Sequence, residues 1–359
     1  SRTWETWAVC EEKNCDPLVL QCFKPNNTLY MLMCFFLVCV TVIYIPLMLF
    51  GLLGNILTIL VVWLRPYMRS STYLYLSSMA VSDLLILLLL PLDLYKLWRP
   101  RPWPLGDLVC KLTMFLSECC TFCTILHITF FSLERYVAVC WPITAKTVVT
   151  RRRTKAVIGC LWLGAAVSAA PVLIMVGVED VGGEELWLSG VAEIDRRECR
   201  CTHYAVTSGL VSAMIVLSNL YFLVPLCILG LVYSLIGRTL WLRPKSSRRD
   251  QSHRNTVKML GVIVLAFVVC WLPFHVGRTI FSFSLDTGTD MSHSYFNLVS
   301  SVLFYLSAAV NPLLYNLMSA RYRHAVHSLI RALMITVNSW IRRCVNRLDK
   351  NTKKAHKTV

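Results

Sequence analysis

The feature that most constrains this chain is a series of seven long apolar stretches joined by short polar connections. An α-helix needs about 20 apolar residues to cross the ~30 Å hydrocarbon core of a bilayer, and each stretch reaches or approaches that length. The stretches cover residues 29–64, 73–95, 108–139, 156–178, 202–237, 259–277 and 291–319. The sequence therefore predicts an all-α membrane protein, a bundle of seven transmembrane helices.

The composition agrees with exposure to lipid. Of the 359 residues, 56% are hydrophobic and only 16% are charged, whereas soluble domains average about 25% charged residues. Intrinsic disorder requires low hydrophobicity, and the strands of a membrane β-barrel would alternate apolar and polar residues. The apolar stretches are neither low in hydrophobicity nor alternating in apolar and polar residues. A soluble domain, a disordered chain and a β-barrel are therefore disfavoured.

The distribution of charge predicts the orientation of the helices. Lys and Arg exceed Asp and Glu by 16, and they gather in every second connection and in the C-terminal tail. Cytoplasmic connections carry such a basic excess, which also attracts lipid headgroups. We therefore expect a multi-pass membrane protein with its N-terminus outside and its C-terminus on the cytoplasmic side. Nucleic-acid binding is disfavoured, because the basic residues are divided among separate connections.

The chain is expected to form one membrane domain between two flanking segments. The segments are an extracellular N-terminus (1–28), the seven-helix domain (29–319), and a cytoplasmic amphipathic helix with a basic tail (320–359). Asn26 begins an Asn-Asn-Thr sequon, so we expect it to be glycosylated outside the cell. The halves of the domain show no repeat, which disfavours a transporter built from duplicated halves.

The cysteines divide into two groups. Most of the 16 Cys lie within the apolar stretches, Cys34 among them, and are interpreted as small apolar filler. Cys110 and Cys199 instead lie at the outer ends of the helices, in an oxidising compartment, and we predict a disulfide between them. Four outer thiols stay unassigned, with Cys201 a competitor for the same partner: Cys10, Cys15, Cys22 and Cys201.

An apolar stripe at helical spacing follows the last stretch, with Arg residues between its members. The stripe consists of Tyr322, Val326, Leu329, Ile330, Leu333 and Val337. This pattern predicts an amphipathic helix on the inner membrane surface. Cys344, flanked by Arg342 and Arg343, is either a palmitoylation site or a plain cytosolic thiol.

Ionisable groups within a membrane are costly and are therefore functional candidates. Asp83 lies in the middle of the second stretch, and Asn55 and Asn311 supply amides at a similar depth. The carboxylate is either a buried hydrogen-bond hub that ties helices together or a hydrated switch that binds a sodium ion.

A second polar group is expected near the outer ends of the helices. Asp93, Glu118, His275 and Arg278 all fall in the outer third of the predicted bundle. Two acids and one arginine would form the polar floor of a pocket, with an ion pair between Glu118 and Arg278. The alternative is that the charged side chains reach up to the surface.

Two features suggest movement at and within the helices. Glu134-Arg135-Tyr136 closes the third stretch, and Arg135 can either pair with its neighbour Glu134 or reach other helices, as a switch would. Proline removes a helix hydrogen bond and kinks the helix. Prolines lie within six of the stretches: Pro46, Pro91, Pro171, Pro225, Pro273 and Pro312.

Short motifs fall one per stretch and in order. They are Gly54-Asn55, Asp83 within residues 80–84, Glu134-Arg135-Tyr136, Trp162, Pro225, Cys270-Trp271-Leu272-Pro273 and Asn311-Pro312-Leu313-Leu314-Tyr315. With this combination the chain resembles the rhodopsin-like class (class A) of G-protein-coupled receptors. Glu134 is a departure, because most members carry Asp there.

Longer segments resemble one group within that class, the ghrelin and motilin receptors. They cover residues 92–95, 101–103, 133–136, 233–238, 270–278 and 303–308. Residues 10–17, 126–129, 149–153 and 295–297 favour the motilin side of the group. Cys201 replaces a Pro of those receptors, Phe130-Phe131 replaces Ala-Leu, and residues 178–198 have their own sequence.

The resemblance implies a cell-surface receptor for a peptide hormone, motilin-like in the first place, with a ghrelin-type or other peptide receptor as the alternative. The residues implied for ligand binding are Asp93, Glu118, Arg278, His275 and Phe274. The residues implied for the activation switch are Asp83, Asn55, Trp271, Phe267, Ile125, Pro225, Pro273, Asn311, Pro312 and Tyr315.

The resemblance also implies partners inside the cell. The first partner would be a heterotrimeric G protein of the Gq/11 type, which signals through phospholipase C and calcium. Arrestin and a receptor kinase would be further partners. The residues implied for coupling are Glu134, Arg135, Tyr136, Ile143 and Tyr233. No cofactor is implied beyond an allosteric sodium ion at Asp83.

Two rival classes remain. An intramembrane enzyme would need paired catalytic groups at one depth, whereas Asp83 and Asp93 are ten residues apart, about 15 Å along one helix. A channel or transporter would use Asp83 as a permeation site, and the absence of duplicated halves disfavours it. We therefore expect no enzyme activity.

Overall fold

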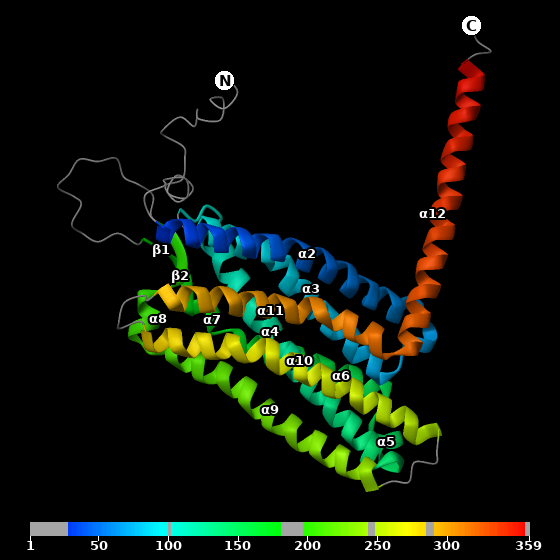
Figure 1. Cartoon of the computed structure of the whole chain (residues 1–359), viewed down its shortest axis with the longest axis horizontal. Coiled ribbons are helices and arrows are strands. Elements are labelled where there is room, and N and C mark those ends of the chain that lie inside the picture. The colour runs from blue at the N-terminus through cyan, green and yellow to red at the C-terminus, as the bar shows by residue number, and fades with distance from the viewer. Residues whose placement is uncertain (1–27, 100–101, 181–196, 243–247, 285–290, 356–359) are drawn as a thin grey trace, which may run out of the picture.

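The computed structural model describes residues 28–99, 102–180, 197–242, 248–284 and 291–355. Seven long helices lie side by side and form one elongated bundle (Figure 1). They are α2 (Thr28–Leu64), α3 (Ser71–Trp98), α4 (Gly106–Cys140), α6 (Arg151–Ala169), α9 (Leu210–Leu242), α10 (Arg248–Ser284) and α11 (Met291–Met318). The predicted all-α fold of seven helices is confirmed.

Length and composition agree with a membrane location for the bundle. Five helical segments of the described residues are long and apolar enough to span a bilayer: Cys34–Leu64, Ser71–Trp98, Gly106–Cys140, Arg151–Met175 and Leu210–Leu242. The other two helices contain the shorter apolar segments Val264–Ile280 and Leu298–Leu314.

Two of the predicted apolar stretches are interrupted in the structure. The fourth apolar stretch is not one helix, because α6 ends at Ala169 and the chain turns at Pro171 into the short helix α7 (Val172–Met175). Pro171 therefore ends a helix, whereas the other five prolines lie inside helices. The fifth stretch is divided at Gly209, whose positive φ of 74° suits glycine, between α8 (His203–Thr207) and α9.

A small antiparallel hairpin covers one end of the bundle, which we call the hairpin end. Its strands are β1 (Val176–Asp180) and β2 (Arg197–Cys201), and Val178 pairs with Cys199. The rest of the fourth apolar stretch thus forms a strand, because it pairs with a segment that lies about twenty residues later.

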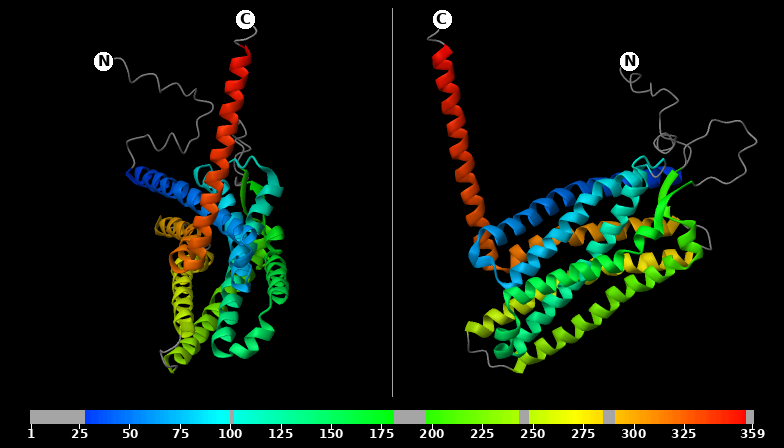
Figure 2. Two further views of the ribbon diagram at one scale, coloured as in Figure 1. Left: turned by 90° about the vertical axis from the view of Figure 1, so that its right-hand side faces the viewer. Right: turned by 180° about the vertical axis from the view of Figure 1, so that it is seen from behind.

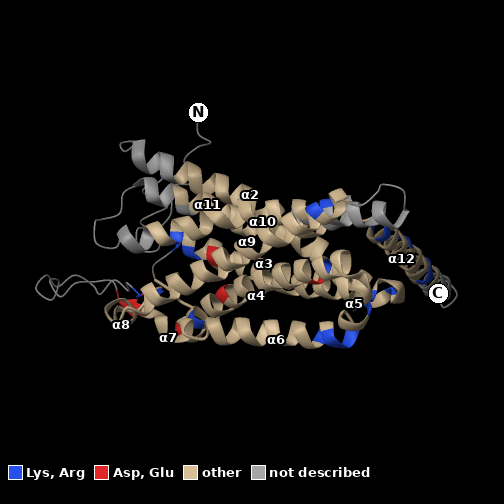
Figure 3. Cartoon of the chain, turned by 90° about the horizontal axis from the view of Figure 1, so that it is seen from below, with Lys and Arg blue, Asp and Glu red and all other residues tan. Residues whose placement is uncertain are grey.

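The opposite end, which we call the α12 end, carries the short helices η1 (Pro66–Met68) and α5 (Pro142–Val148) and the long helix α12 (Ala320–Ala355). α2 begins at the hairpin end, whereas α12 starts at the other end and runs across the bundle rather than along it (Figures 1 and 2). Lys and Arg are concentrated towards the α12 end (Figure 3).

The core of the bundle follows its length. The largest cluster is centred on α3, α4, α9, α10 and α11 and includes the fully buried Ile125, Phe222, Phe267 and Trp271. A second cluster joins α2 and α3 to Tyr322 and Leu329 of α12. The side chains on the bundle exterior are largely apolar and exposed, among them Leu53, Leu88 and Leu163, as a lipid-facing surface requires.

Candidate functional site

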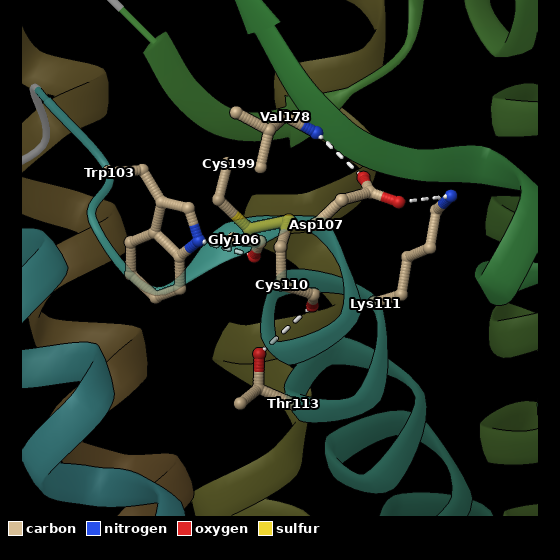
Figure 4. Close-up of a disulfide and its surroundings, with 8 residues drawn as sticks. All are labelled: Trp103, Gly106, Asp107, Cys110, Lys111, Thr113, Val178 and Cys199. Carbon is tan, nitrogen blue, oxygen red and sulfur yellow. Dashed lines mark hydrogen bonds and ion pairs between the residues drawn. A yellow bond between two sulfur atoms is a disulfide. The ribbon is translucent and has the colours of Figure 1, made fainter.

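The hairpin is held over the bundle by covalent and polar links (Figure 4). Cys110 of α4 forms a disulfide with Cys199 of β2, with an S–S distance of 2.02 Å, which confirms the predicted pairing. The Asp107 carboxylate accepts a hydrogen bond from the backbone N–H of Val178 at 3.1 Å and pairs with Lys111 at 2.6 Å. The hairpin therefore has a fixed position at the mouth of the bundle.

Two other cysteines, Cys34 and Cys201, lie near the hairpin end of the bundle. Cys201, the competing thiol, is free, and burial raises the pKa of this thiol, which keeps it protonated. Cys34 is disulfide-bonded, so its interpretation as apolar filler was wrong. The signal for this was its position in the first two turns of α2 (Thr28–Leu64), near the end that the charge distribution predicts to be extracellular.

Beneath the hairpin, an ion pair joins α4 to α10. Arg278 Nη1 donates to Glu118 Oε2 at 2.7 Å and also approaches Ser218 Oγ of α9 at 3.5 Å. Glu118 is 7% exposed, and its second oxygen has no hydrogen-bond partner among the described residues. The ion pair expected between these residues is present, and one buried acceptor is left over for another donor.

Asp93 lies apart from that pair, in a cavity of about 280 Å³ between α2, α3 and α11. Its carboxylate accepts a hydrogen bond from the Tyr305 hydroxyl of α11. Asp93 therefore does not join Glu118 and Arg278 in one ionic group. The sequence grouped them by depth alone, which does not distinguish one side of a bundle from the other.

Lys96 also lines this cavity, and sequence reasoning missed it. Its ammonium nitrogen is buried, has no hydrogen-bond partner among the described residues and stands 5.1 Å from the centre of the Trp103 ring. A search for ionisable residues one turn from Asp93 would have found it. The cavity thus combines a carboxylate with a buried cation.

An aromatic column descends from this polar level into the core. His275 stacks on Phe222 with ring centroids 4.6 Å apart, and neither of its ring nitrogens has a partner among the described residues. The ring centroids of Phe274 and Trp271 are 6.0 Å apart, and those of Trp271 and Phe267 are 6.1 Å apart. The column therefore packs ring against ring from the polar level down to the buried Phe267.

The buried polar network in the middle of the bundle differs in part from expectation. Asn311 Nδ2 donates to Asp83 Oδ2 at 3.0 Å, which ties α11 to α3. Among the described residues, Asn55 forms no hydrogen bond with Asp83; its amide donates to the carbonyls of Ala308 at 3.0 Å and Gly51 at 2.9 Å. Asn55 therefore links α2 to the backbone of α11.

A very small cavity lies next to this network. Its volume is about 10 Å³, and Trp271, Thr124, Ser307 and Asn311 are among the residues that line it. Trp271 belongs to the aromatic column, and Asn311 donates a hydrogen bond to Asp83. Hydroxyl and amide oxygens thus meet beside a buried carboxylate, with room for about one water-sized sphere.

At the α12 end, Glu134 and Arg135 have separate partners. Glu134 Oε1 accepts hydrogen bonds from the Tyr75 hydroxyl at 2.9 Å and from Thr154 at 3.3 Å. Arg135 forms no ion pair within the described part of the chain, and its guanidinium stands 5.5 Å from the centre of the Phe131 ring. The neighbour-to-neighbour pair is not formed, because Glu134 points to α3 and α6.

The remaining predicted residues fall into three groups. Ile143 of α5 is 84% exposed at the α12 end, whereas Tyr136 packs against Trp141 and Tyr233 lies partly buried between helices. Ile125 and Pro225 are buried, and Pro273 lies inside α10, where its carbonyl accepts a bond from Ser300. Asn26 and the side chain of Tyr315 lie outside the described residues.

Comparison with known proteins agrees with this arrangement. Residues 54–315 match the 7 transmembrane receptor (rhodopsin family) model. Growth hormone secretagogue receptor type 1 of Sus scrofa is 52% identical over 300 residues, which cover 81% of this chain and 80% of that receptor. The motilin receptor of Homo sapiens is 40% identical over 370 residues, which cover 92% and 86%. The neurotensin receptor type 1 of Rattus norvegicus is 33% identical over 332 residues, which cover 82% and 76%.

These similarities and the seven-helix bundle give one conclusion. The family match covers most of the chain, and relatives above 50% identity are receptors and not enzymes. The chain belongs to the rhodopsin family of seven-transmembrane receptors, in the group of the growth hormone secretagogue and motilin receptors.

Proposed function

We propose that this receptor binds a peptide hormone at the hairpin end and transmits that event to a heterotrimeric G protein at the α12 end. The observation that carries the proposal is the buried Glu118–Arg278 pair beneath the hairpin. A charge pair within a membrane bundle is expensive, and its unpaired Glu118 oxygen offers an acceptor to a ligand donor.

The hormone would insert its N-terminal part between two polar sites. Glu118 and Arg278 form one site, and Asp93 with Lys96 forms the other. His275 and Phe274 would contact the apolar part of the hormone above Trp271. Two sites that each present both charges favour a zwitterionic peptide over a simple cation or anion.

Two hormone classes are candidates. Short segments of the sequence favour the motilin receptor. The overall identity is instead higher to the growth hormone secretagogue receptor, 52%, than to the motilin receptor, 40%. The identities refer to different lengths, 300 and 370 residues. A ghrelin-type hormone therefore fits at least as well as a motilin-like one, and the deciding experiment uses both.

The orientation is part of the proposal. The hairpin end would be extracellular, because it holds the disulfide Cys110–Cys199, and disulfides persist in oxidising compartments. The basic α12 end would face the cytoplasm, with the receptor in the plasma membrane and Asn26 available for glycosylation.

Activation would proceed through the aromatic column. The hormone would displace Trp271 and Phe267 against Ile125 and Pro225, and α10 would swing about Pro273. A cleft would then open beside Arg135, Tyr233 and Tyr315 for the C-terminal helix of a G-protein α subunit. Ile143 would supply an exposed apolar contact. Hormone and G protein must both favour the open state, so their coupling is reciprocal.

Further partners follow from the family. We propose Gq/11 and a calcium response, with later binding of a receptor kinase and arrestin. We also propose a sodium ion near Asp83, where the carboxylate and the oxygens of Thr124, Ser307 and Asn311 would hold it. We propose palmitoylation at Cys344, whose thiol is free on α12.

The experiment is a peptide panel on cells that express the full chain. Motilin, ghrelin and unrelated peptides are added, and calcium and cyclic AMP are recorded, with untransfected cells as the control. A calcium response to one or both of the two hormones is the expected result. Ion flux without any hormone, or no response to any peptide, would contradict the proposal.

A further inference from the structure

Arg135 is a partly buried cation near the end of α4. Its Nε atom is buried and has no hydrogen-bond partner among the described residues. Arginine is always charged in proteins, and a charge that is taken out of water is costly unless another group stabilises it. The guanidinium of Arg135 therefore needs a favourable contact with a neighbouring side chain.

The adjacent carboxylate does not supply this contact. Glu134 Oε1 accepts hydrogen bonds from the Tyr75 hydroxyl at 2.9 Å and from Thr154 at 3.3 Å, so it faces α3 and α6. The ion pairs between described residues join other groups and do not include Arg135. Consecutive helix residues point about 100° apart, which explains why the two charged side chains diverge. The contact of Arg135 must therefore lie on its own face of α4.

That face carries Phe131, one turn earlier in the helix. The guanidinium carbon of Arg135 stands 5.5 Å from the centre of the Phe131 ring. Side chains of a helix lean toward its N-terminus, so a residue reaches back over the residue four positions before it. A cation within about 6 Å of a ring centre is attracted by the negative face of the ring, more strongly where water is excluded. Phe131 is 2% exposed, so little water reaches its ring.

The Phe131 ring is held in place by its neighbours. It belongs to the buried cluster that joins α2 and α3 to α12, and its centroid lies 6.0 Å from that of the Tyr75 ring. The same Tyr75 donates its hydroxyl to Glu134. One side chain of α3 thus binds the carboxylate and packs against the ring, which leaves the ring as the contact of Arg135.

We propose that Phe131 is a positioning residue, whose ring holds the Arg135 guanidinium in the resting receptor through a cation–π contact. Activation must draw Arg135 off the ring, so a weaker contact raises signalling without hormone. The inference rests on the proposed role of Arg135 in coupling to the G protein. It is separate from the hydrogen bond between Tyr75 and Glu134, because it depends on the electron density of a ring and not on a hydroxyl.

The first test changes the electrostatics of the ring and keeps its shape. Position 131 of the full receptor receives 4-fluoro-, 3,5-difluoro- or 3,4,5-trifluorophenylalanine, because fluorine withdraws the electron density that makes the ring face negative. Hormone-free inositol phosphate production should rise with each added fluorine, by about 2- to 30-fold for the trifluoro ring. The matched control is the same series at the adjacent Phe130, which is exposed and should show no trend.

A second measurement needs neither hormone nor G protein. The fluorine NMR resonance of 4-fluorophenylalanine at position 131 is recorded in purified receptor, with and without the substitution Arg135→Gln. We expect the substitution to shift this resonance and to leave the resonance of the same probe at position 130 unchanged. A shifted resonance in a receptor that responds to no peptide would contradict the proposed function alone, because it would still demonstrate the contact.

Phe131→Leu separates the cation–π contact from packing. Leucine keeps an apolar side chain but has no ring face, so hormone-free signalling should rise at least as far as with the trifluoro ring. A rise in Phe131→Leu together with a flat fluorine series would assign the effect to packing and overturn the proposal. An equal trend at Phe130, a fall in hormone-free signalling, or a resonance at position 131 that does not respond to Arg135→Gln would also overturn it.

Discussion

Gly54 of α2 packs directly against Pro312 of α11. A Cβ atom on Gly54 would lie 2.9 Å from Cβ and 3.1 Å from Cγ of that proline ring. One turn earlier, a Cβ on Gly51 would lie 3.2 Å from the backbone of Ala309. The two helices therefore approach each other at glycine, in the same region where Asn55 reaches the Ala308 carbonyl.

This close approach predicts a stability effect. Gly54→Ala should destabilise the receptor by about 1–3 kcal/mol, because an overpacked contact forces the helices apart. The measurement is the thermal unfolding midpoint of the hormone-free receptor in detergent. Gly159→Ala is the control, since no atom lies within 4 Å of a Cβ at that glycine of α6, and it should be neutral or slightly stabilising. An unchanged midpoint for Gly54→Ala would contradict the packing argument.

The ion pair predicts an effect on hormone potency. Glu118→Gln keeps the size of the side chain but leaves Arg278 without its partner at 2.7 Å. A hydrogen bond to a charged group contributes about 1.5–3 kcal/mol, so the loss of the Glu118 carboxylate as an acceptor for the hormone should lower potency in the calcium assay by about 10- to 100-fold. Surface expression, measured on intact cells, should remain within about twofold of wild type, since the isosteric amide preserves packing. Unchanged potency would remove Glu118 from the binding site.

Arg135 predicts a separation of binding from signalling. Arg135→Ala should abolish nucleotide exchange on the G protein while the hormone still binds, because Arg135 lies in the last turns of α4 (Gly106–Cys140), about 25 Å along that helix from Glu118. Both quantities are measured on the same purified receptor in nanodiscs. Arg152→Ala, an exposed arginine at the start of α6, is the control and should signal normally. Normal nucleotide exchange in Arg135→Ala would exclude the switch role.

Tyr75 predicts a change in basal activity. Glu134 Oε1 accepts two hydrogen bonds. The bond from the Tyr75 hydroxyl, at 2.9 Å, is shorter than the bond from the Thr154 hydroxyl, at 3.3 Å. A hydrogen bond to a charged group contributes about 1.5–3 kcal/mol, so Tyr75→Phe should raise hormone-free inositol phosphate production by about tenfold if the bond stabilises the resting state. Tyr73→Phe, whose hydroxyl lies 3.4 Å from Ser319, should have little effect. Equal basal activity in both variants would rule out such a restraint.

Asp83 predicts dependence on sodium. An ion that favours the resting state must lower hormone affinity, because coupling between two ligands is reciprocal. Replacing potassium by sodium at constant ionic strength should therefore weaken hormone binding to the wild-type receptor. In Asp83→Asn the difference between the two salts should vanish, because the carboxylate is lost. A sodium effect that persists in this variant would place the ion elsewhere.

The helices and their order were predictable because their cause is local. Apolar length and the positions of basic residues decide which segments cross a membrane, and each can be read in a short window. The disulfide Cys110–Cys199 was predictable for a related reason, since both cysteines lie at the same end of the bundle. Strand β1 at the end of the fourth apolar stretch was not predictable, because it forms by pairing with β2, about twenty residues later in the chain.

The polar contacts depended on helix rotation and neighbour choice, which residue spacing does not define. Asp93 and Glu118 have similar depth, yet one meets Tyr305 and the other meets Arg278. Likewise, Glu134 lies beside Arg135 in the chain but bonds to Tyr75.

The sequence by itself determined that this chain spans a membrane seven times. It also identified the ionisable residues within the spans as candidates for a structural or functional role. The tertiary structure alone decided which of those residues are partners and that Lys96 lines the Asp93 cavity. It also showed that the apolar stripe of α12 is buried as far as Leu329 and exposed from Leu333 onwards. The physical reason is that hydrophobic burial acts on each segment separately, whereas hydrogen bonds and ion pairs require two groups within about 3 Å.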